Sequence, residues 1–223
     1  MDFNKDELME YFLVDNPDNV MDKLLEFNRL MMKYRSAIRE VTTKLEVLND
    51  ELSLYGNRNP IEDIQSRIKT PVSIAEKLKR LGKPVNMDEI MENLNDVAGI
   101  RVICPFIQDI YRVADMLTRQ DDITVIKVKD YIKNPKENGY RSYHLIVEVP
   151  VFFSDVTQPM RVEVQIRTVA MNFWASLEHQ IRYKKDIEDA EKITKELKEC
   201  ADIIAVTDEK MQKLKDKILG EMK

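Results

Sequence analysis

Residues 161–167 carry the pattern with the most chemical content in this sequence, a strict alternation of apolar and polar side chains. Successive side chains of a β-strand point to opposite faces of its sheet, so the alternation predicts a strand with one apolar face, formed by Val162, Val164 and Ile166. The other face would carry Arg161, Glu163, Gln165 and Arg167. Two cations, a carboxylate and an amide in one row can bind phosphate groups and a divalent cation, although a surface strand could carry them for solubility alone.

Two further strand-like segments also carry polar side chains. Residues 95–103 read Asn-Asp-Val-Ala-Gly-Ile-Arg-Val-Ile, and residues 138–144 read Asn-Gly-Tyr-Arg-Ser-Tyr-His. Alternation in the second segment places Tyr140, Ser142 and His144 on one face. Three such strands in one sheet would form a charged surface suited to chemistry on phosphates.

A basic run over residues 67–77 leads into a predicted helix. Arg67 and Lys69 lie on one face of an extended segment, and Ser73 belongs to the first helical turn, where free backbone N–H groups and the helix dipole attract anions. Lys77 lies one turn further along the same helix face. These four residues are predicted to converge on an anion, unless the lysines are ordinary solvated surface groups.

Phosphate chemistry also needs a divalent cation, and Mg²⁺ is usually bound by one or two carboxylates. Asp96, directly before a strand, and Glu163, within one, are the best candidates. Arg101 follows Asp96 along the same strand and could reach a different part of a triphosphate. Each acid also has an ordinary interpretation, since Asp96 could be a turn residue and Glu163 an exposed strand carboxylate.

An aromatic side chain lies beside these groups in the sequence. Tyr140 follows a glycine in a predicted loop, and next to Lys136 it could stack on a nucleobase. Tyrosine near a strand also commonly packs against its neighbours, which is the alternative interpretation.

Composition and charge restrict the class of protein. The chain has 223 residues and a net charge of −5, so a broad nucleic-acid-binding surface is not expected. Basic residues nevertheless dominate residues 57–83 and 127–143, which favours a local anion site. The five glycines are scattered and form no phosphate-binding loop, so side chains would have to bind the phosphates. The two cysteines form no Cys-x-x-Cys pattern, so a zinc site is not expected.

The sequence shows no sign of membrane targeting. No apolar run is long enough to cross a membrane, and the acidic N-terminus lacks the apolar core of a signal peptide. We therefore expect a cytoplasmic protein with no membrane partner.

Periodicity and turn residues predict the order of the elements. A short amphipathic helix is predicted over Lys5–Val14, and an apolar seam with heptad spacing from Leu24 to Tyr55 predicts a long helix. The predicted order then continues with helix Pro71–Leu81, helix Met87–Asn93, strand 97–104, helix Asp109–Arg119, strand Ile123–Tyr131, loop 132–139, strands 141–150 and 160–167, and helix Val169–Lys184. A second seam over residues 193–218 predicts a long C-terminal helix. The fold class is therefore α/β (α+β), with helices flanking a mixed β-sheet of about five strands.

This order predicts three regions. An N-terminal helical region covers residues 1–59, a catalytic domain covers 60–185, and a C-terminal helix covers 186–223. The two apolar seams could pack within the chain, but long paired helices would leave much apolar surface exposed, so we favour oligomerisation.

Five motifs occur in a fixed order along the chain. They are Arg-x-Lys-x-Pro-x-Ser-Ile-x-x-Lys (67–77), Asp-x-Ala-Gly-x-Arg-Val (96–102), Asn-Gly-Tyr-Arg-Ser-Tyr-His (138–144), Val-Glu-Val-Gln-Ile-Arg-Thr (162–168) and Met-Asn-Phe-Trp-Ala-x-x-Glu-His (171–179). Over about residues 60–185 the sequence resembles the synthetase domain of the RelA/SpoT family, whose fold is nucleotidyltransferase-like. In length it is similar to the stand-alone small alarmone synthetases.

This resemblance implies a GTP pyrophosphokinase, which transfers the β,γ-pyrophosphate of ATP to the 3′-hydroxyl of GTP or GDP and releases AMP. It implies that ATP is held by Arg67, Lys69, Ser73, Lys77 and Arg101. It implies that GTP or GDP is bound by Lys129, Lys136, Tyr140, His144, Gln165 and Asn172. Asp96 and Glu163 would be the catalytic residues and would bind Mg²⁺, and Glu163 would also take the proton from the attacking hydroxyl.

The resemblance also bears on partners. Some family members are homotetramers, so a tetramer is the favoured oligomer. With only two histidines, His144 and His179, the chain lacks the cluster that the family's hydrolase domain requires, and no hydrolase activity is expected. We expect His179 and Trp174 to have packing roles, whereas His144 is either a nucleotide contact or a hydrogen-bonded structural histidine.

Two other functions are weighed. The first is a nucleotide- or single-stranded-RNA-binding module without catalysis, although a pure binder gains nothing from two acids beside phosphates. The second is a terminal nucleotidyltransferase, which is disfavoured because no Gly-Ser followed by Asp-x-Asp is present.

Overall fold

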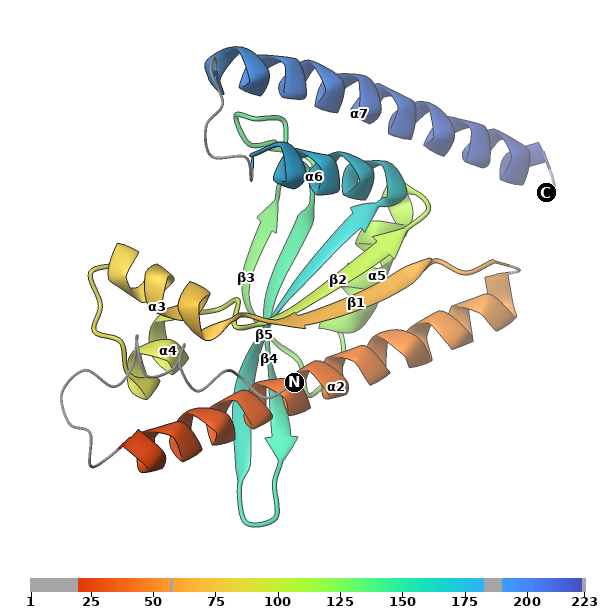
Figure 1. Cartoon of the computed structure of the whole chain (residues 1–223). Coiled ribbons are helices and arrows are strands. Elements are labelled where there is room, and N and C mark those ends of the chain that lie inside the picture. The colour runs from red at the N-terminus through yellow and green to blue at the C-terminus, as the bar shows by residue number, and fades with distance from the viewer. Residues whose placement is uncertain (1–19, 57, 183–189, 222–223) are drawn as a thin grey trace.

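The computed structural model describes residues 20–56, 58–182 and 190–221. The helix predicted over Lys5–Val14 lies outside these residues. The others form a single five-stranded sheet with helices on both sides (Figure 1).

The sheet is mixed, as predicted. Its strands are β1 (Asp63–Ile68), β2 (Ala98–Cys104), β3 (Thr124–Asp130), β4 (Tyr143–Phe152) and β5 (Thr157–Thr168). They lie in the order β1-β2-β5-β4-β3, with β2 and β5 parallel and the other neighbours antiparallel. The segment before Pro71, predicted only as extended, becomes edge strand β1 because it pairs with β2.

Helix α2 (Val20–Gly56) crosses one face of the sheet and shares a core with it (Figure 1). Its apolar seam is buried from Phe27 to Leu52, against sheet residues such as Val147 and Val164. Helix α5 (Ile107–Thr118) joins this core through its own apolar side. The N-terminal seam therefore packs against the sheet within the chain, which is one of the two alternatives considered above, and the oligomeric state stays a prediction.

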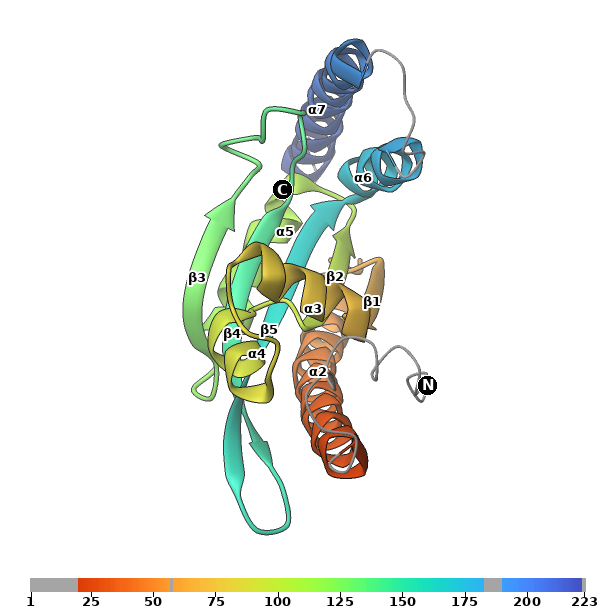
Figure 2. The ribbon, with the colours of Figure 1, turned by 60° about the vertical axis from the view of Figure 1, so that its left-hand side comes forward.

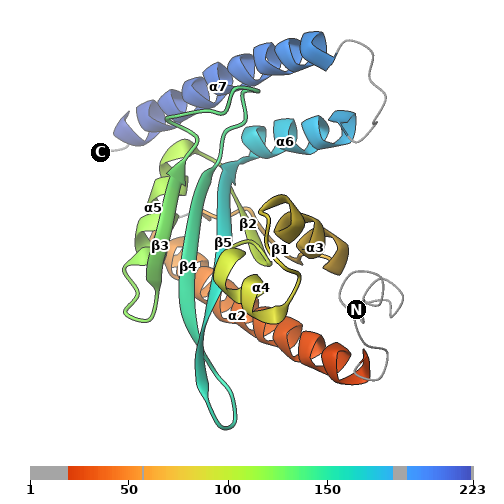
Figure 3. The ribbon, with the colours of Figure 1, turned by 90° about the vertical axis from the view of Figure 1, so that its left-hand side faces the viewer.

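Two shorter helices lie on the other side of the sheet from α5 (Figure 3). They are α3 (Pro71–Arg80) and α4 (Met87–Asn93), and both begin at residues that cap the first turn. Thr70 caps α3, where its Oγ1 accepts from the backbone N–H of Ser73, and Asn86 caps α4 in the same way. Gly82, at φ +68°, follows the end of α3, a position that favours glycine.

Helices α6 (Val169–Arg182) and α7 (Ala190–Glu221) lie side by side at one end of the sheet (Figures 1 and 2). The predicted C-terminal seam is only partly buried. Leu197 and Ala201 pack against Trp174 of α6, which confirms the packing role expected for that residue. Beyond them the apolar side chains of α7 are exposed, namely Ile203, Val206, Met211, Leu214 and Ile218.

The three predicted regions do not have separate cores among the described residues, because α2 and the sheet form one apolar cluster. The boundary at residues 59 and 60 stays a prediction, and the boundary at 185 and 186 falls outside the described residues. Of the described helices, none combines the length and the apolar character that crossing a membrane requires.

The seam of α2 makes a quantitative prediction about stability. Leu45→Ala removes a side chain that is fully buried against the sheet, so we expect the free energy of unfolding to fall by about 2–5 kcal/mol. Val47→Ala, at an exposed position of the same helix, should change it by less than about 0.5 kcal/mol. Urea unfolding followed by circular dichroism measures both. Equal effects would show that this face of α2 does not form the core.

Candidate active site

The strand register gathers the predicted polar residues on the sheet face opposite α2. Glu163 lies opposite Gly99, and Gln165 lies opposite both Arg101 and His144. Arg67 of β1 in turn lies opposite Gly99. The alternate residues of β5 (Val162, Val164 and Ile166) are fully buried in the core, as the alternation predicted.

Arginine side chains meet on this face without enough negative charge to balance them. Arg67, Arg101 and Arg167 line one groove, together with Tyr140, Gln165 and part of α6. The pKa of the Arg101 guanidinium is lowered by burial and then by the charges of Arg167 and Arg67. Its Nε is buried and has no hydrogen-bond partner. A half-buried guanidinium with an unsatisfied Nε, beside two other cations, is suited to bind an anion.

The basic entrance of α3 is organised around Asp96. Its carboxylate lies 2.8 Å from the Lys69 ammonium and 2.7 Å from the Lys77 ammonium. Burial raises the pKa of Asp96, but the hydrogen bonds and charges of the two lysines outweigh burial, and the pKa lies below its usual range. The structure thus brings Lys69 and Lys77 together as predicted, but around an acid rather than around Ser73. The Ser73 hydroxyl instead accepts a hydrogen bond of 3.0 Å from Thr70.

Glu163 belongs to a closed ring of five hydrogen-bonded side chains, which we call the polar ring (Arg167, Tyr140, His144, Glu163 and Gln165). Arg167 Nη2 donates to the Tyr140 hydroxyl at 2.6 Å, and that hydroxyl lies 2.8 Å from His144 Nε2. His144 Nδ1 lies 3.3 Å from Glu163 Oε1. Gln165 Nε2 donates to Glu163 Oε2 at 2.8 Å, and Gln165 Oε1 accepts from Arg167 at 2.9 Å, which closes the ring.

The protonation states of the ring follow from burial and from these contacts. Burial lowers the pKa of His144, although Glu163 opposes it, so the imidazole is neutral near neutral pH. A neutral imidazole with its proton on Nδ1 donates to Glu163 and accepts from Tyr140 at Nε2. Burial raises the pKa of Glu163, but the hydrogen bonds from His144 and Gln165 outweigh it and lower the pKa. Glu163 is therefore an ionised, half-buried carboxylate.

The two acids singled out by the sequence are electrostatic neighbours. The negative charge of Asp96 raises the pKa of Glu163, against the hydrogen bonds that lower it. Within the described residues no group of three or more His, Cys, Asp or Glu side chains gathers to hold a metal ion. The site therefore offers two carboxylates and a groove lined with cations.

The remaining predicted residues lie around the polar ring. The Lys136 ammonium lies 4.7 Å from the centre of the Tyr140 ring and 5.0 Å from that of Tyr131. Asn172 of α6 accepts a hydrogen bond of 3.5 Å from Arg167. Lys129 lies opposite His144 in the register of β3 and β4, on the edge strand of the sheet.

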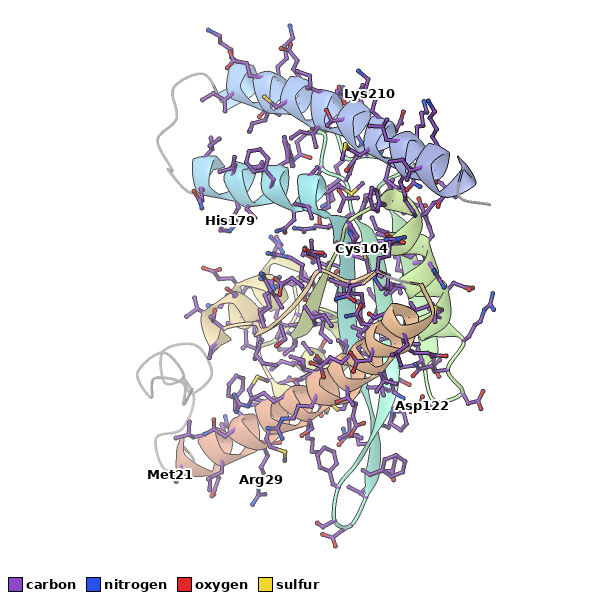
Figure 4. All side chains as sticks on the ribbon, turned by 90° about the vertical axis from the view of Figure 1, so that its right-hand side faces the viewer. Met21, Arg29, Cys104, Asp122, His179 and Lys210 are labelled. Atoms are coloured by element: carbon purple, nitrogen blue, oxygen red, sulfur yellow. The ribbon has the colours of Figure 1, made fainter. Side chains whose placement is uncertain are left out.

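Sequence reasoning missed or misjudged four residues of this site. Arg167 was part of the polar strand face but was given no role. No motif or periodicity in the sequence marked Thr70 or Tyr131 as part of a site. Tyr131 packs edge-on against both Tyr140 and His144. His179, expected to pack, is instead exposed and lines the groove from the side of α6 that faces α3 (Figure 4).

The motifs and this geometry are those of a known family. A sequence model described as "Region found in RelA / SpoT proteins" matches residues 66–188. The chain belongs to the RelA/SpoT family.

Similar RelA/SpoT proteins have nearly the same length. The GTP pyrophosphokinase YwaC of Bacillus subtilis (strain 168) is 42% identical over 205 residues, which cover 92% of this chain and 98% of that protein. The GTP pyrophosphokinase YjbM of the same organism is 37% identical over 193 residues, which cover 86% and 90%.

Solved structures of small alarmone synthetases share the fold. Small alarmone synthetase 1 from Bacillus subtilis bound to its product pppGpp superimposes with a TM-score of 0.79 at 36% identity, covering 86% of this chain and 98% of that one. Small alarmone synthetase 2 from the same organism gives a TM-score of 0.77 at 43% identity, covering 86% and 99%. These RelA/SpoT structures confirm the predicted fold, including the long N- and C-terminal helices.

The polar ring makes a prediction about His144. In Glu163→Gln the pKa of the imidazole should fall further below its ordinary value, because the carboxylate that raises it by charge is gone. Nuclear magnetic resonance titration of the imidazole resonances measures it, with His179→Gln to assign the only other histidine. Glu148→Gln, a carboxylate on β4 outside the ring, should leave the pKa of His144 unchanged. A rise in Glu163→Gln would contradict the ring.

Proposed function

We propose that this protein is a GTP pyrophosphokinase, which transfers the β,γ-pyrophosphate of ATP to the 3′-hydroxyl of GTP or GDP and forms pppGpp or ppGpp with AMP. One observation carries the proposal: the ionised Glu163 is held in the polar ring at the edge of a groove lined by unpaired arginine charge. The relatives named as GTP pyrophosphokinases and the structure of a relative with pppGpp bound support it.

The donor nucleotide would occupy the groove over β1 and β2. Arg67 and Arg101 both line it, and the unsatisfied Nε of Arg101 suits a phosphate oxygen. Lys69, Ser73 and Lys77 at the start of α3 would bind the other phosphates of ATP. A related synthetase crystallised with AMPCPP, a non-hydrolysable ATP analogue, supports binding of this class of donor.

The acceptor nucleotide would lie against the polar ring. Tyr140 offers a ring face for guanine, and Lys136, already near that face, would neutralise the phosphates together with Lys129. His144, Gln165 and Asn172 would orient the ribose and base from the sheet and from α6. Two nucleotides held in this way would bring the 3′-hydroxyl in line with the pyrophosphate group.

Glu163 would act as the general base. It is ionised, rigidly oriented by His144 and Gln165, and on the strand next to the one that carries Arg101. The 3′-hydroxyl would transfer its proton to a carboxylate oxygen as the new O–P bond forms, and AMP would leave. The neutral His144 keeps its Nδ1 proton and stabilises the carboxylate until that transfer.

Mg²⁺ would be held by Asp96 and Glu163. The donor set fits, because Mg²⁺ usually takes one or two carboxylates and completes its coordination with substrate phosphates and water. Asp96 and Glu163 are close enough for the charge of one to alter the pKa of the other. When bound, the ion neutralises charge on the transferred group. Lys69 and Lys77, whose ammonium groups already contact Asp96, would then lie beside those phosphates.

The wider organisation also belongs to this proposal. We place the catalytic domain at residues 60–185. We also expect a homo-oligomer, with a tetramer favoured, since α7 exposes Ile203, Leu214 and Ile218 to solvent.

The protein would act in the cytoplasm, where ATP and GTP are made. Single-stranded RNA stays a candidate additional partner. The alternative function, a binding module without catalysis, is disfavoured because such a module would not need two carboxylates beside a phosphate-binding groove.

Replacement of the base tests the reaction. Glu163→Gln should lower turnover by about 10²–10⁴-fold, because the amide cannot accept the proton. The Kd values for AMPCPP and GDP should change little, since the amide keeps the shape of the site. Turnover is measured with labelled ATP and GTP or GDP, by separating the pentaphosphate and tetraphosphate products.

The matched control is Glu148→Gln, on neighbouring strand β4, where the carboxylate contacts Arg161 outside the polar ring. It should retain wild-type turnover. A wild-type protein that forms no product would overturn the proposed function, and an active Glu163→Gln would remove Glu163 from its role.

A further inference from the structure

The loop that carries the acceptor-binding side chains rests directly on α7. We call residues 131–142, between β3 and β4, the acceptor loop. Arg141 of this loop donates to the carbonyl oxygen of Ala201 at 3.3 Å and to the Asp202 carboxylate at 3.1 Å. The same guanidinium donates back to the carbonyl of Gly139 at 3.1 Å, so it joins the turn of the loop to α7.

The loop and α7 approach each other closely at Gly139. This residue has φ +88°, a conformation that favours glycine, and a Cβ built on it would lie 2.6 Å from the Cβ of Ala201. It would also lie 3.3 Å from the Cα of Lys198. The backbone of the loop and the surface of α7 are therefore in direct contact, with no space for a side chain between them.

Tyr140 links this contact to the polar ring. One side of the residue packs on the cluster of Trp174, Leu197 and Ala201, where the Trp174 indole donates to the Leu197 carbonyl at 2.8 Å. Its hydroxyl meets Arg167 and His144. A displacement of α7 would thus move the platform proposed for guanine.

A second set of contacts anchors α7 to the strand that carries Glu163. The buried Asp208 accepts a hydrogen bond of 2.5 Å from Thr168, the last residue of β5, which also caps the first turn of α6. Further along, Gln212 accepts from the backbone N–H of Gln108 at 3.1 Å. Helix α7 is therefore held at both the acceptor loop and the end of β5.

We infer that α7 is the positioning element of the acceptor site: through Ala201 and Asp202 it holds the acceptor loop in the shape that binds the guanine nucleotide. This inference rests on the proposed function for the identity of the acceptor. The donor residues lie on β1, β2 and α3, whereas α7 packs mainly against α6 and α5. Loss of the α7 contacts should therefore weaken acceptor binding and leave donor binding intact.

Two variants on α7 test this, both outside the catalytic machinery. Ala201→Leu forces a larger side chain against Gly139, and Asp202→Ala removes the exposed carboxylate that pairs with Arg141. The matched controls are Cys200→Leu and Glu209→Ala, at exposed positions of the same helix. Thermal unfolding of all four checks that they fold.

Steady-state kinetics separate the two substrates. In Ala201→Leu we expect the KM for GDP to rise about tenfold with the KM for ATP unchanged, because misplacement of a substrate-positioning group weakens that substrate alone. Asp202→Ala should raise the KM for GDP about threefold, as expected for a partly exposed ion pair, and Asp202→Glu should restore it. The controls should match the wild type. Equal changes in both KM values, or none, would overturn the inference.

Hydrogen exchange tests the same contact without nucleotides. Backbone amides of residues 136–141 should exchange several-fold faster in Ala201→Leu and Asp202→Ala than in the wild type and the controls, because opening of the loop is no longer opposed by α7. Unchanged exchange would overturn the inference. If exchange changes but the wild type forms no pyrophosphoryl product, the proposed function fails and the contact between α7 and the loop stands.

Discussion

The polar ring around Glu163 is the interaction on which the rest of the site depends. A carboxylate withdrawn from water is costly unless hydrogen bonds and nearby charges stabilise it, and here His144 and Gln165 supply the hydrogen bonds. Arg167, itself buried, closes the ring through Gln165 and Tyr140. Because every member of the ring is bonded to two others, the carboxylate proposed as the general base, the candidate base-stacking tyrosine and the histidine between them share one geometry.

The topology of the sheet explains why the residues proposed to bind the donor and those proposed to bind the acceptor lie on two sides of that ring. Parallel pairing of β2 with β5 sets Arg101 beside Gln165, while antiparallel pairing with β4 sets His144 on the other side of Gln165. Helix α2 covers the opposite face and buries the alternate residues of the same strands. Strand β5 therefore contributes its apolar residues to the core and its polar residues to the site. Because the apolar residues are fixed by packing, the backbone that carries Glu163 is held rigidly.

The cations of the site fall into two groups with different partners. Lys69 and Lys77 already neutralise Asp96, whereas Arg101 is left with an unsatisfied Nε between other arginines. The first group organises the entrance of α3, and the second keeps an anion-binding surface open. Helix α7 also supports the site, from outside the sheet. It contacts the loop that carries Tyr140, whereas Arg67 and Arg101 lie on strands of the sheet.

Local sequence determined much of this protein. Alternation predicted β5 and its two faces, turn residues predicted the limits of α3, and the motifs led to the family that the comparisons confirm. What depended on the tertiary structure were the partners: Lys69 and Lys77 with Asp96, Arg167 with Tyr140, and the α2 seam with the sheet. Periodicity reports which face of an element is apolar, because it depends on neighbours a few residues away. It does not report which distant element meets that face, because that choice is made by the packing of the whole chain.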